Sequence, residues 1–161
     1  MSSLDLAIIG NCSFGALIDS RASIVWSCMP RFDSDPVFCG LLKDEESSDS
    51  GVFDVELQDF QRSEQHYRRN SAVVITRLYD SSDGVVEVTD FAPRFKHFGR
   101  IFRPPTIVRH VRPVSGSPRV RLRVRPNHDY GRGEPQTTRG SNHVRYVMPH
   151  LTLRLTTDAP I

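Results

Sequence analysis

Residues 119–125 read RVRLRVR, in which arginine alternates strictly with an apolar residue. Side chains on a β-strand point to opposite faces with a period of two, so this segment predicts a strand. Val120, Leu122 and Val124 would lie on one face of that strand, and the four arginines would lie on the other.

The same period of two recurs along most of the chain and predicts an all-β fold. Turn-forming residues separate the alternating segments: Asp19–Ala22, Asp80–Gly84 and Ser115–Pro118 each fit a turn between two strands, and Gly84 is expected to take a positive φ. Many short strands separated by such turns indicate an antiparallel β-sandwich. The expected strands are Leu6–Gly10, Phe14–Asp19, Ser23–Cys28, Val52–Leu57, Ala72–Tyr79, Val85–Phe91, Thr106–Val114, Arg119–Arg125, His143–Val147 and Leu151–Thr156.

Few or no helices are expected, because no segment repeats its apolar residues every 3.6 positions. The best helical candidate is a turn or two over Pro36–Leu42. Two polar segments, Lys43–Gly51 and Arg132–Asn142, are expected to form surface loops. The length of 161 residues fits one domain covering residues 1–161. The chain ends directly after a predicted strand, which suggests that the domain is cut from a longer protein.

The charges are unevenly distributed along the chain. Residues 1–90 carry 7 Lys and Arg against 16 Asp and Glu, a net charge of −9, whereas residues 91–161 carry 14 against 3, a net charge of +11. Such an asymmetry fits a nucleic-acid surface, two parts of one domain that attract each other, or a face that docks on an acidic partner.

The arginine face of residues 119–125 leaves two functional interpretations open. Four like charges on one strand face could form a track for DNA or RNA, which would make the chain a nucleic-acid-binding β-domain. The alternative is a sheet face whose arginines pair with acids on neighbouring strands. We favour the second and expect no nucleic-acid binding, because no aromatic residues are interleaved with the arginines to stack on bases.

Other residues with reactive side chains show no pattern that predicts a metal or cofactor site. Cys12, Cys28 and Cys39 are too few and too widely spaced for zinc, and an odd number of cysteines without an export signal suggests reduced thiols in the cytoplasm. The histidines lack metal-ligand spacing. No apolar run approaches the roughly 18 residues of a membrane span. Gly10–Gly15 and His128–Gly131 are expected to be turns rather than phosphate-binding or catalytic motifs.

The segment from Trp26 to Phe38, WSCMPRFDSDPVF, is the most unusual in the chain. It predicts a strand followed by a loop bounded by Pro30 and Pro36, because proline interrupts strand pairing. This loop carries Arg31, Phe32, Asp33 and Asp35. An arginine donates and an aspartate accepts hydrogen bonds, which suits the hydroxyl groups of a sugar. The alternative, which we slightly favour, is a purely structural role in which Arg31 holds the loop in place.

Three blocks of the sequence together resemble a known family. They are LAIIGNCSFGALIDSRASIVWSCMPRFDSDPVF (6–38), YRRNSAVVITRLYDSSDGVVEVTDFAPR (67–94) and IVRHVRPVSGSPRVRLRVRPNHDYGR (107–132). In this order they are similar to the beginning of bacterial glycoside hydrolase family 15 proteins, the glucoamylase-like and trehalase-like enzymes. The chain departs from the family pattern at Asp35 and at Ser20–Ser23, where the turn lacks its usual glycine.

The resemblance implies that the chain is the N-terminal β-sandwich of a longer enzyme, part of a larger super-sandwich. Its partner would be the α/α-barrel domain of the same parent chain, which carries the family's catalytic glutamates, so we expect no catalytic residue here. The parent would act on an oligosaccharide or trehalose without a cofactor. Arg31, Phe32 and Asp33 are the candidate substrate-binding residues. Unpaired sheet edges could also support a homodimer.

Overall fold

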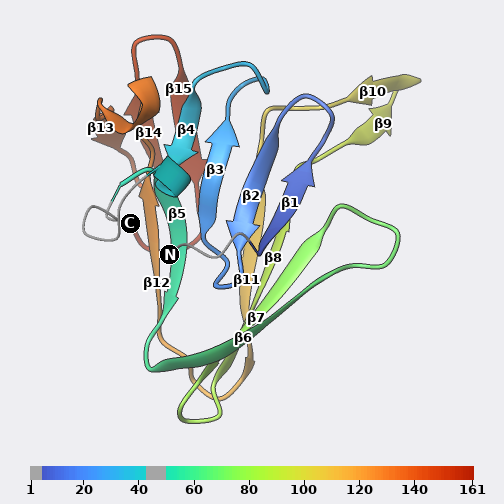
Figure 1. The fold of residues 1–161 in the computed structure, drawn as a ribbon, viewed down its shortest axis with the longest axis vertical. Helices are drawn as coiled ribbons and strands as arrows, with labels where there is room; N and C mark the ends of the chain where they lie inside the picture. Colours follow the sequence, from blue (N-terminus) through green and yellow to red (C-terminus); the bar gives the residue numbers. More distant parts are fainter. Residues whose placement is uncertain (1–4, 43–49) are drawn as a thin grey trace.

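The computed structural model describes residues 5–42 and 50–161 and has the predicted all-β architecture (Figure 1). The prediction of an antiparallel β-sandwich with few or no helices is confirmed. Across the described parts of the chain there is no α-helix, and single turns of 3₁₀ helix occur at Gly40–Leu42 and Asp129–Gly131.

One sheet of the sandwich combines the N-terminal strands with the arginine strand. Its order is β1 (Leu6–Gly10), β2 (Gly15–Asp19), β3 (Ile24–Cys28), β5 (Val52–Leu57) and β12 (Val120–Arg125), with β4 (Pro36–Cys39) pairing with β3 beside β5. Every neighbouring pair is antiparallel. The arginine strand is therefore an edge strand that pairs with the acidic strand β5.

The second sheet has the order β11 (Val108–Ser115), β8 (Val85–Phe91), β7 (Val74–Asp80) and β6 (Phe60–Tyr67). A separate three-stranded sheet contains β13 (Gln136–Arg139), β14 (His143–Val147) and β15 (Thr152–Thr156). A hairpin of β9 (Phe95–His97) and β10 (Arg100–Phe102) projects from the body of the molecule (Figure 1).

Apolar side chains from the two main sheets fill the space between them. The larger cluster is built around Phe14, Ile9, Ile18, Ile24 and Val74, and a second cluster contains Leu57, Leu78, Val86 and Val88. The alternation in the sequence places these residues on the inner faces, and burial of each large side chain contributes about 1.5–3 kcal/mol.

Several strands that the sequence analysis did not predict have unusual surroundings. All four residues of β4 are buried, so this segment lacks the alternation of a strand with one exposed face. The helical turn expected over Pro36–Leu42 is confined to the last three residues of that range, Gly40–Leu42. Strand β6 is mostly exposed and therefore polar on both faces. The predicted loop over Arg132–Asn142 was wrong in part because it contains β13. The other predicted loop, Lys43–Gly51, lies mainly outside the described residues.

The turn before β8 differs from the prediction in which residue adopts a positive φ. Asp83, not Gly84, adopts the positive φ, at 61°. A Cβ atom on Gly84 would lie 2.1 Å from Oδ2 of Asp80, and the Asp80 carboxylate accepts hydrogen bonds from the Ser82 and Gly84 amides at 2.7 Å. The glycine is therefore required for this close approach, whereas aspartate tolerates the left-handed conformation.

Candidate functional site

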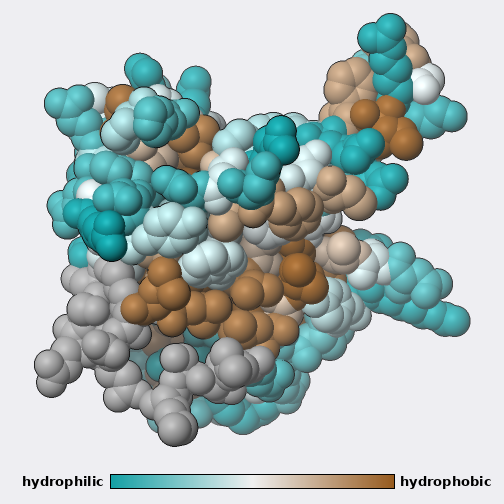
Figure 2. Space-filling model, turned by 45° about the horizontal axis from the view of Figure 1, so that its top comes forward, coloured by the Kyte–Doolittle hydropathy of each residue, from teal (hydrophilic) through white to brown (hydrophobic). Residues whose placement is uncertain are grey.

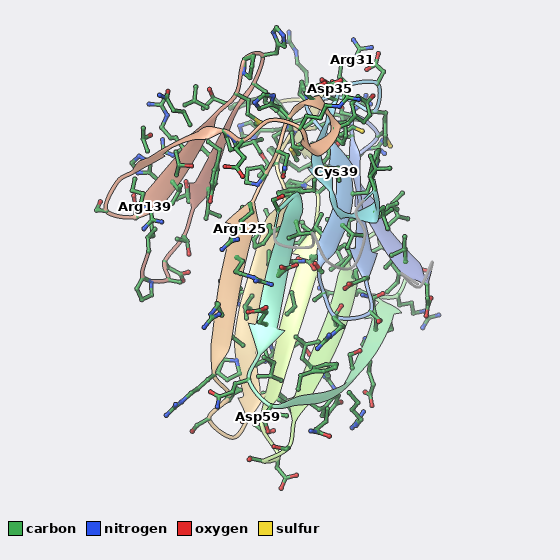
Figure 3. The ribbon with its side chains drawn as sticks, turned by 60° about the vertical axis from the view of Figure 1, so that its left-hand side comes forward. Arg31, Asp35, Cys39, Asp59, Arg125 and Arg139 are labelled. Atoms are coloured by element: carbon green, nitrogen blue, oxygen red, sulfur yellow. The ribbon has the colours of Figure 1, made fainter. Side chains whose placement is uncertain are left out.

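The loop between β3 and β4 holds the residues predicted to bind substrate. It lies at one end of the sandwich, where Figure 3 labels Arg31 and Asp35, and Asp59 marks the opposite end. Nε and Nη2 of Arg31 donate to the two carboxylate oxygens of Asp33, both at 2.9 Å. The prediction that Pro36 interrupts strand pairing was wrong, because Pro36 pairs with Cys28 as the first residue of β4. A proline is tolerated at that position because it is the start of the strand.

The Arg31–Asp33 pair is formed but remains open to solvent. The Arg31 and Asp33 side chains are 73% and 69% exposed. Hydrogen bonds from Arg31 hold the pKa of Asp33 below its usual value, so the carboxylate is ionised at neutral pH. A carboxylate has about four lone-pair sites, and two hydrogen bonds leave capacity to accept from a ligand hydroxyl.

Phe32 turns its ring toward the neighbouring β1–β2 turn. A Cβ atom on Gly15 would lie 3.1 Å from Cε1 of Phe32, so the ring covers this glycine while 60% of the residue stays exposed. The structure therefore brings Arg31, Phe32 and Asp33 into one exposed loop. Their proposed contact with a sugar stays a prediction.

The β1–β2 turn also fixes the projecting hairpin, a connection that the sequence analysis missed. Asn11 is 1% exposed, and its Nδ2 donates to the carbonyl oxygens of Pro93 at 3.0 Å and Pro104 at 2.8 Å. These two residues flank the hairpin on either side. Nη1 of Arg94 also lies 3.2 Å from Sγ of Cys12. The loop between β3 and β4 and the projecting hairpin thus both contact the β1–β2 turn.

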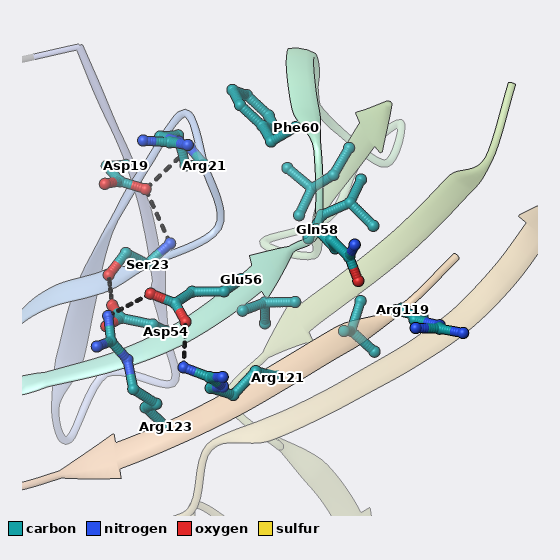
Figure 4. Close-up of a pocket in the computed structure, with 14 residues that line it drawn as sticks. Asp19, Arg21, Ser23, Asp54, Glu56, Gln58, Phe60, Arg119, Arg121 and Arg123 are labelled. Carbon is teal, nitrogen blue, oxygen red and sulfur yellow. Dashed lines mark hydrogen bonds and ion pairs between the residues drawn. The ribbon is translucent and has the colours of Figure 1, made fainter. Parts of the chain in front are cut away.

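Arg121 and Arg123, two of the four arginines in residues 119–125, pair with acids of the neighbouring strand, as the favoured interpretation predicted. Nη2 of Arg123 contacts Oδ2 of Asp54 at 3.0 Å and Oε1 of Glu56 at 2.6 Å, and Arg121 lies 3.8 Å from Glu56 (Figure 4). These contacts join β12 to β5 along a pocket of about 640 Å³. The charges of Arg121 and Arg123 are balanced by acids of the same protein, which disfavours the nucleic-acid interpretation.

Asp54 and Glu56 form a pair of carboxylates on one face of β5, which the sequence analysis did not identify. Residues two apart on a strand share a face, so the alternation in VFDVEL was the signal for this pair. Both carboxylates are held by Arg123, and Asp54 also accepts from the Ser23 hydroxyl (Figure 4). The two acids therefore stabilise the β5–β12 pairing.

Asp19 lies at the rim of the same pocket. Its carboxylate accepts from the Arg21 amide at 2.9 Å and the Ser23 amide at 2.8 Å. Burial outweighs these bonds and raises the pKa of Asp19 above its usual value. This residue closes the β2–β3 turn.

A wide groove of about 2010 Å³ lies between β11, β12 and the β13–β15 sheet. Val120 and Leu122, on the apolar face of β12, line this groove and are exposed. Exposed apolar residues beside an unpaired strand edge can support contact with another part of a protein.

No group of three or more His, Cys, Asp or Glu side chains that could hold a metal ion occurs within residues 5–42 and 50–161. His128–Gly131 forms the expected turn, in which Gly131 has a φ of 91°. No helix in this part of the chain is long and apolar enough to span a membrane.

The antiparallel sheets and their loop-bearing end define the chain as an all-β sandwich domain. The family model described as "Trehalase-like, N-terminal" matches residues 4–155. The chain therefore belongs to the trehalase-like N-terminal family.

The curated relatives that match the chain are longer archaeal trehalases. The chain is 31% identical over 160 residues to trehalase 1 of Sulfolobus acidocaldarius, covering 96% of the chain and 25% of the relative. It is 22% identical over 153 residues to the trehalase of Thermoplasma volcanium, covering 95% and 24% respectively. The chain thus spans about a quarter of the length of these relatives. No solved structure matches it.

Proposed function

We propose that the chain is the non-catalytic N-terminal domain of a cytoplasmic glycoside hydrolase of family 15 that cleaves an α-glucosidic bond in trehalose or an oligosaccharide. The observation that carries this proposal is the match to the trehalase-like N-terminal family over residues 4–155, in a chain that spans a quarter of its relatives. The remaining part of the parent would contain the catalytic α/α barrel. The sandwich would pack on this barrel and continue into a larger super-sandwich along the groove beside β12.

The pairing of the acidic residues supports a non-catalytic role. An inverting glycosidase needs two carboxyl groups about 6.5–9.5 Å apart, one acting as acid and the other as base toward a water molecule. Asp33, Asp54, Glu56 and Asp90 each form an ion pair with an arginine of this chain. Hydrogen bonds from Arg31 lower the pKa of Asp33, which makes this carboxyl group a poor general acid.

The activity of the parent enzyme tests the proposal. Purified full-length parent should release glucose from trehalose or from maltooligosaccharides, and comparison of the two substrates assigns the linkage. The 161-residue chain should release none. Turnover by this chain that is lost on changing Asp33 or Asp35 would show that it carries catalytic residues of its own.

We further propose that Arg31, Phe32 and Asp33 reach the rim of the sugar pocket in the parent. The exposed Arg31–Asp33 pair offers both donors and acceptors, and the Phe32 ring beside it offers an apolar surface. This combination suits the hydroxyl groups and the apolar face of a pyranose.

Asp33→Asn in the full-length parent separates the binding role from the structural one. Loss of a sugar hydrogen bond should raise KM or lower kcat by about tenfold. The matched control is Glu64→Gln, because Glu64 forms the same kind of exposed pair with Arg62, two residues away on β6. Unchanged kinetics of Asp33→Asn together with a lowered Tm would assign the loop to the scaffold.

A further inference from the structure

The hairpin formed by β9 and β10 exposes an unusual amount of apolar surface. Every residue from Arg94 to Arg103, hereafter the arm, is exposed. Phe98 at its tip is 87% exposed, and Phe95, Ile101 and Phe102 are exposed as well. Figure 2 shows apolar and hydrophilic residues mixed on this projecting part of the molecule. Clustered exposed apolar residues mark interaction sites more often than single ones do.

The arm also presents one sign of charge. Arg94, Lys96, Arg100 and Arg103 are basic, and no acidic residue occurs between Phe91 and His128. The ring centroids of Phe95 and Phe102 are stacked 5.7 Å apart, and His97 lies 4.0 Å from Phe98. Large aromatic groups beside arginines are typical of the residues that dominate binding energy in protein interfaces.

The tip residue is unfavourable for folding of the arm by itself. Phe98 and Gly99 have φ values of 46° and 72°, and they form the two-residue turn between β9 and β10. A turn with positive φ at both central residues favours Asn-Gly, whereas a bulky residue at the first position is strained. The chain thus has an exposed phenylalanine where asparagine would favour both folding and solubility. An isolated two-stranded hairpin is also marginally stable in water.

The attachment of the arm to the sandwich is nevertheless well defined. The buried Asn11 side chain holds the carbonyl groups of Pro93 and Pro104 at the two ends of the arm. A fixed base lowers the conformational entropy that a binding element loses when it docks. The arm therefore combines a defined position with a surface that has no cover within the described residues.

We propose that the arm docks on an acidic surface with an apolar centre, located in the part of the parent enzyme that follows residue 161. This inference rests on the proposed function, in which the parent enzyme is about four times as long as the chain, as its relatives are. A second copy of the chain is the competing partner, although its acids Asp33, Glu64 and Glu87 already pair with arginines of their own chain. Phe98 is the anchor of the contact, with Lys96 and Arg100 on the strands next to the tip and Arg94 and Arg103 at the base of the arm.

Hydrogen exchange of the arm amides in the full-length parent tests this proposal through the variant Phe98→Asn. The substitution creates an Asn-Gly turn, which favours the hairpin, but removes the anchor. If the arm docks, its amides should exchange on the order of tenfold faster in Phe98→Asn than in the unmodified parent. If the arm is free, the better turn should leave exchange unchanged or slow it, and either result would overturn the proposal.

Two further variants test the electrostatic part of the contact. Arg100→Glu should also accelerate exchange in the arm, because it places a negative charge against an acidic surface. Arg119→Glu is the matched control, an exposed basic residue before β12, and it should leave the arm unchanged. Equal exchange in both variants would contradict the proposed acidic partner.

The competing partner and the proposed function are distinguished by separate measurements. Protection that disappears on tenfold dilution, together with a dimer-to-monomer change in light scattering, would assign the arm to a second copy and overturn the proposal. If the parent cleaves no α-glucoside but Phe98→Asn accelerates exchange, the proposed function fails and the docking stands. If the parent is active but the arm is free, only the docking fails.

Discussion

Replacing Asp90 with alanine should be among the most damaging single changes in the sandwich. Asp90 lies on the inner face of β8, and its side chain is 0% exposed. Nε and Nη2 of Arg109, on β11, donate to its two oxygens at 2.7 and 2.9 Å. Arg109 is itself 3% exposed, and it also donates to the Phe53 carbonyl at 2.9 Å, which connects the two sheets.

The magnitude follows from the burial of both charges. Alanine at position 90 would remove two charge-assisted hydrogen bonds and leave the Arg109 guanidinium in the core with the Phe53 carbonyl and ring as its remaining partners. Removal of one member of a buried pair costs about 3–5 kcal/mol. A domain of this size loses about 2–4 °C in Tm per kcal/mol, so Tm should fall by roughly 6–20 °C.

Equilibrium urea denaturation and thermal unfolding of the 161-residue chain measure this loss. The control is Asp33→Ala, which removes an equally bidentate pair that is exposed, and which should leave the urea midpoint unchanged within error. The double variant Asp90→Leu with Arg109→Met should recover most of the lost stability, because it removes both charges. A loss below about 1 kcal/mol for Asp90→Ala would refute the argument.

Three further predictions concern other parts of the chain. Hydrogen bonds from Arg112 and a second arginine lower the pKa of Glu87 below its ordinary value of 4.5, so the stability that Glu87 contributes is present above pH 4.5 and is lost as pH falls through the lower folded pKa. Glu87→Gln should therefore make the urea midpoint decline less steeply on acidification. An unchanged decline would contradict this prediction. Asn11→Ala should reduce the free energy of unfolding by about 1–3 kcal/mol, because the partly buried Pro93 and Pro104 carbonyls lose their donor. An unaltered denaturation curve would show that water replaces the amide. Fluorescence anisotropy should detect no binding of the chain to DNA or RNA oligonucleotides at physiological salt, whereas submicromolar affinity would restore the nucleic-acid interpretation.

The sequence predicted the strands whose alternation reflects one buried and one exposed face. The RVRLRVR segment is the clearest case, since both its strand and its pairing with acids of a neighbouring strand are confirmed. Strands β4 and β6 were missed because one is buried on both faces and the other is exposed on both, so neither alternates. A period of two in the sequence reflects a difference in burial between the two faces of a strand, and it gives no signal where both faces are equally buried or equally exposed.

The candidate site was only partly predictable for a different reason. The sequence identified Arg31 and Asp33 as a donor and an acceptor in one loop, but it could not show that they bind each other. The link between Asn11 and the base of the arm joins residues 82 and 93 positions apart, and a single sequence contains no signal for such contacts. The hairpin of β9 and β10 also lacks a strong local signal, because Phe98-Gly99 replaces the favoured Asn-Gly and is flanked by His97 and Arg100.

The ion pairs that join the acidic and basic parts of the chain have a consequence for its synthesis on the ribosome. Arg109, Arg112, Arg121 and Arg123 all bind acids among the first 90 residues. The first 90 residues therefore emerge with a net charge of −9, before the arginines that pair with Asp54, Glu56 and Asp90 have been translated. Strand β5 can pair with the edge strand β12 only after residue 125 has been translated. The nascent chain must keep this acidic edge exposed until then, and mutual repulsion between such chains would hinder their premature association.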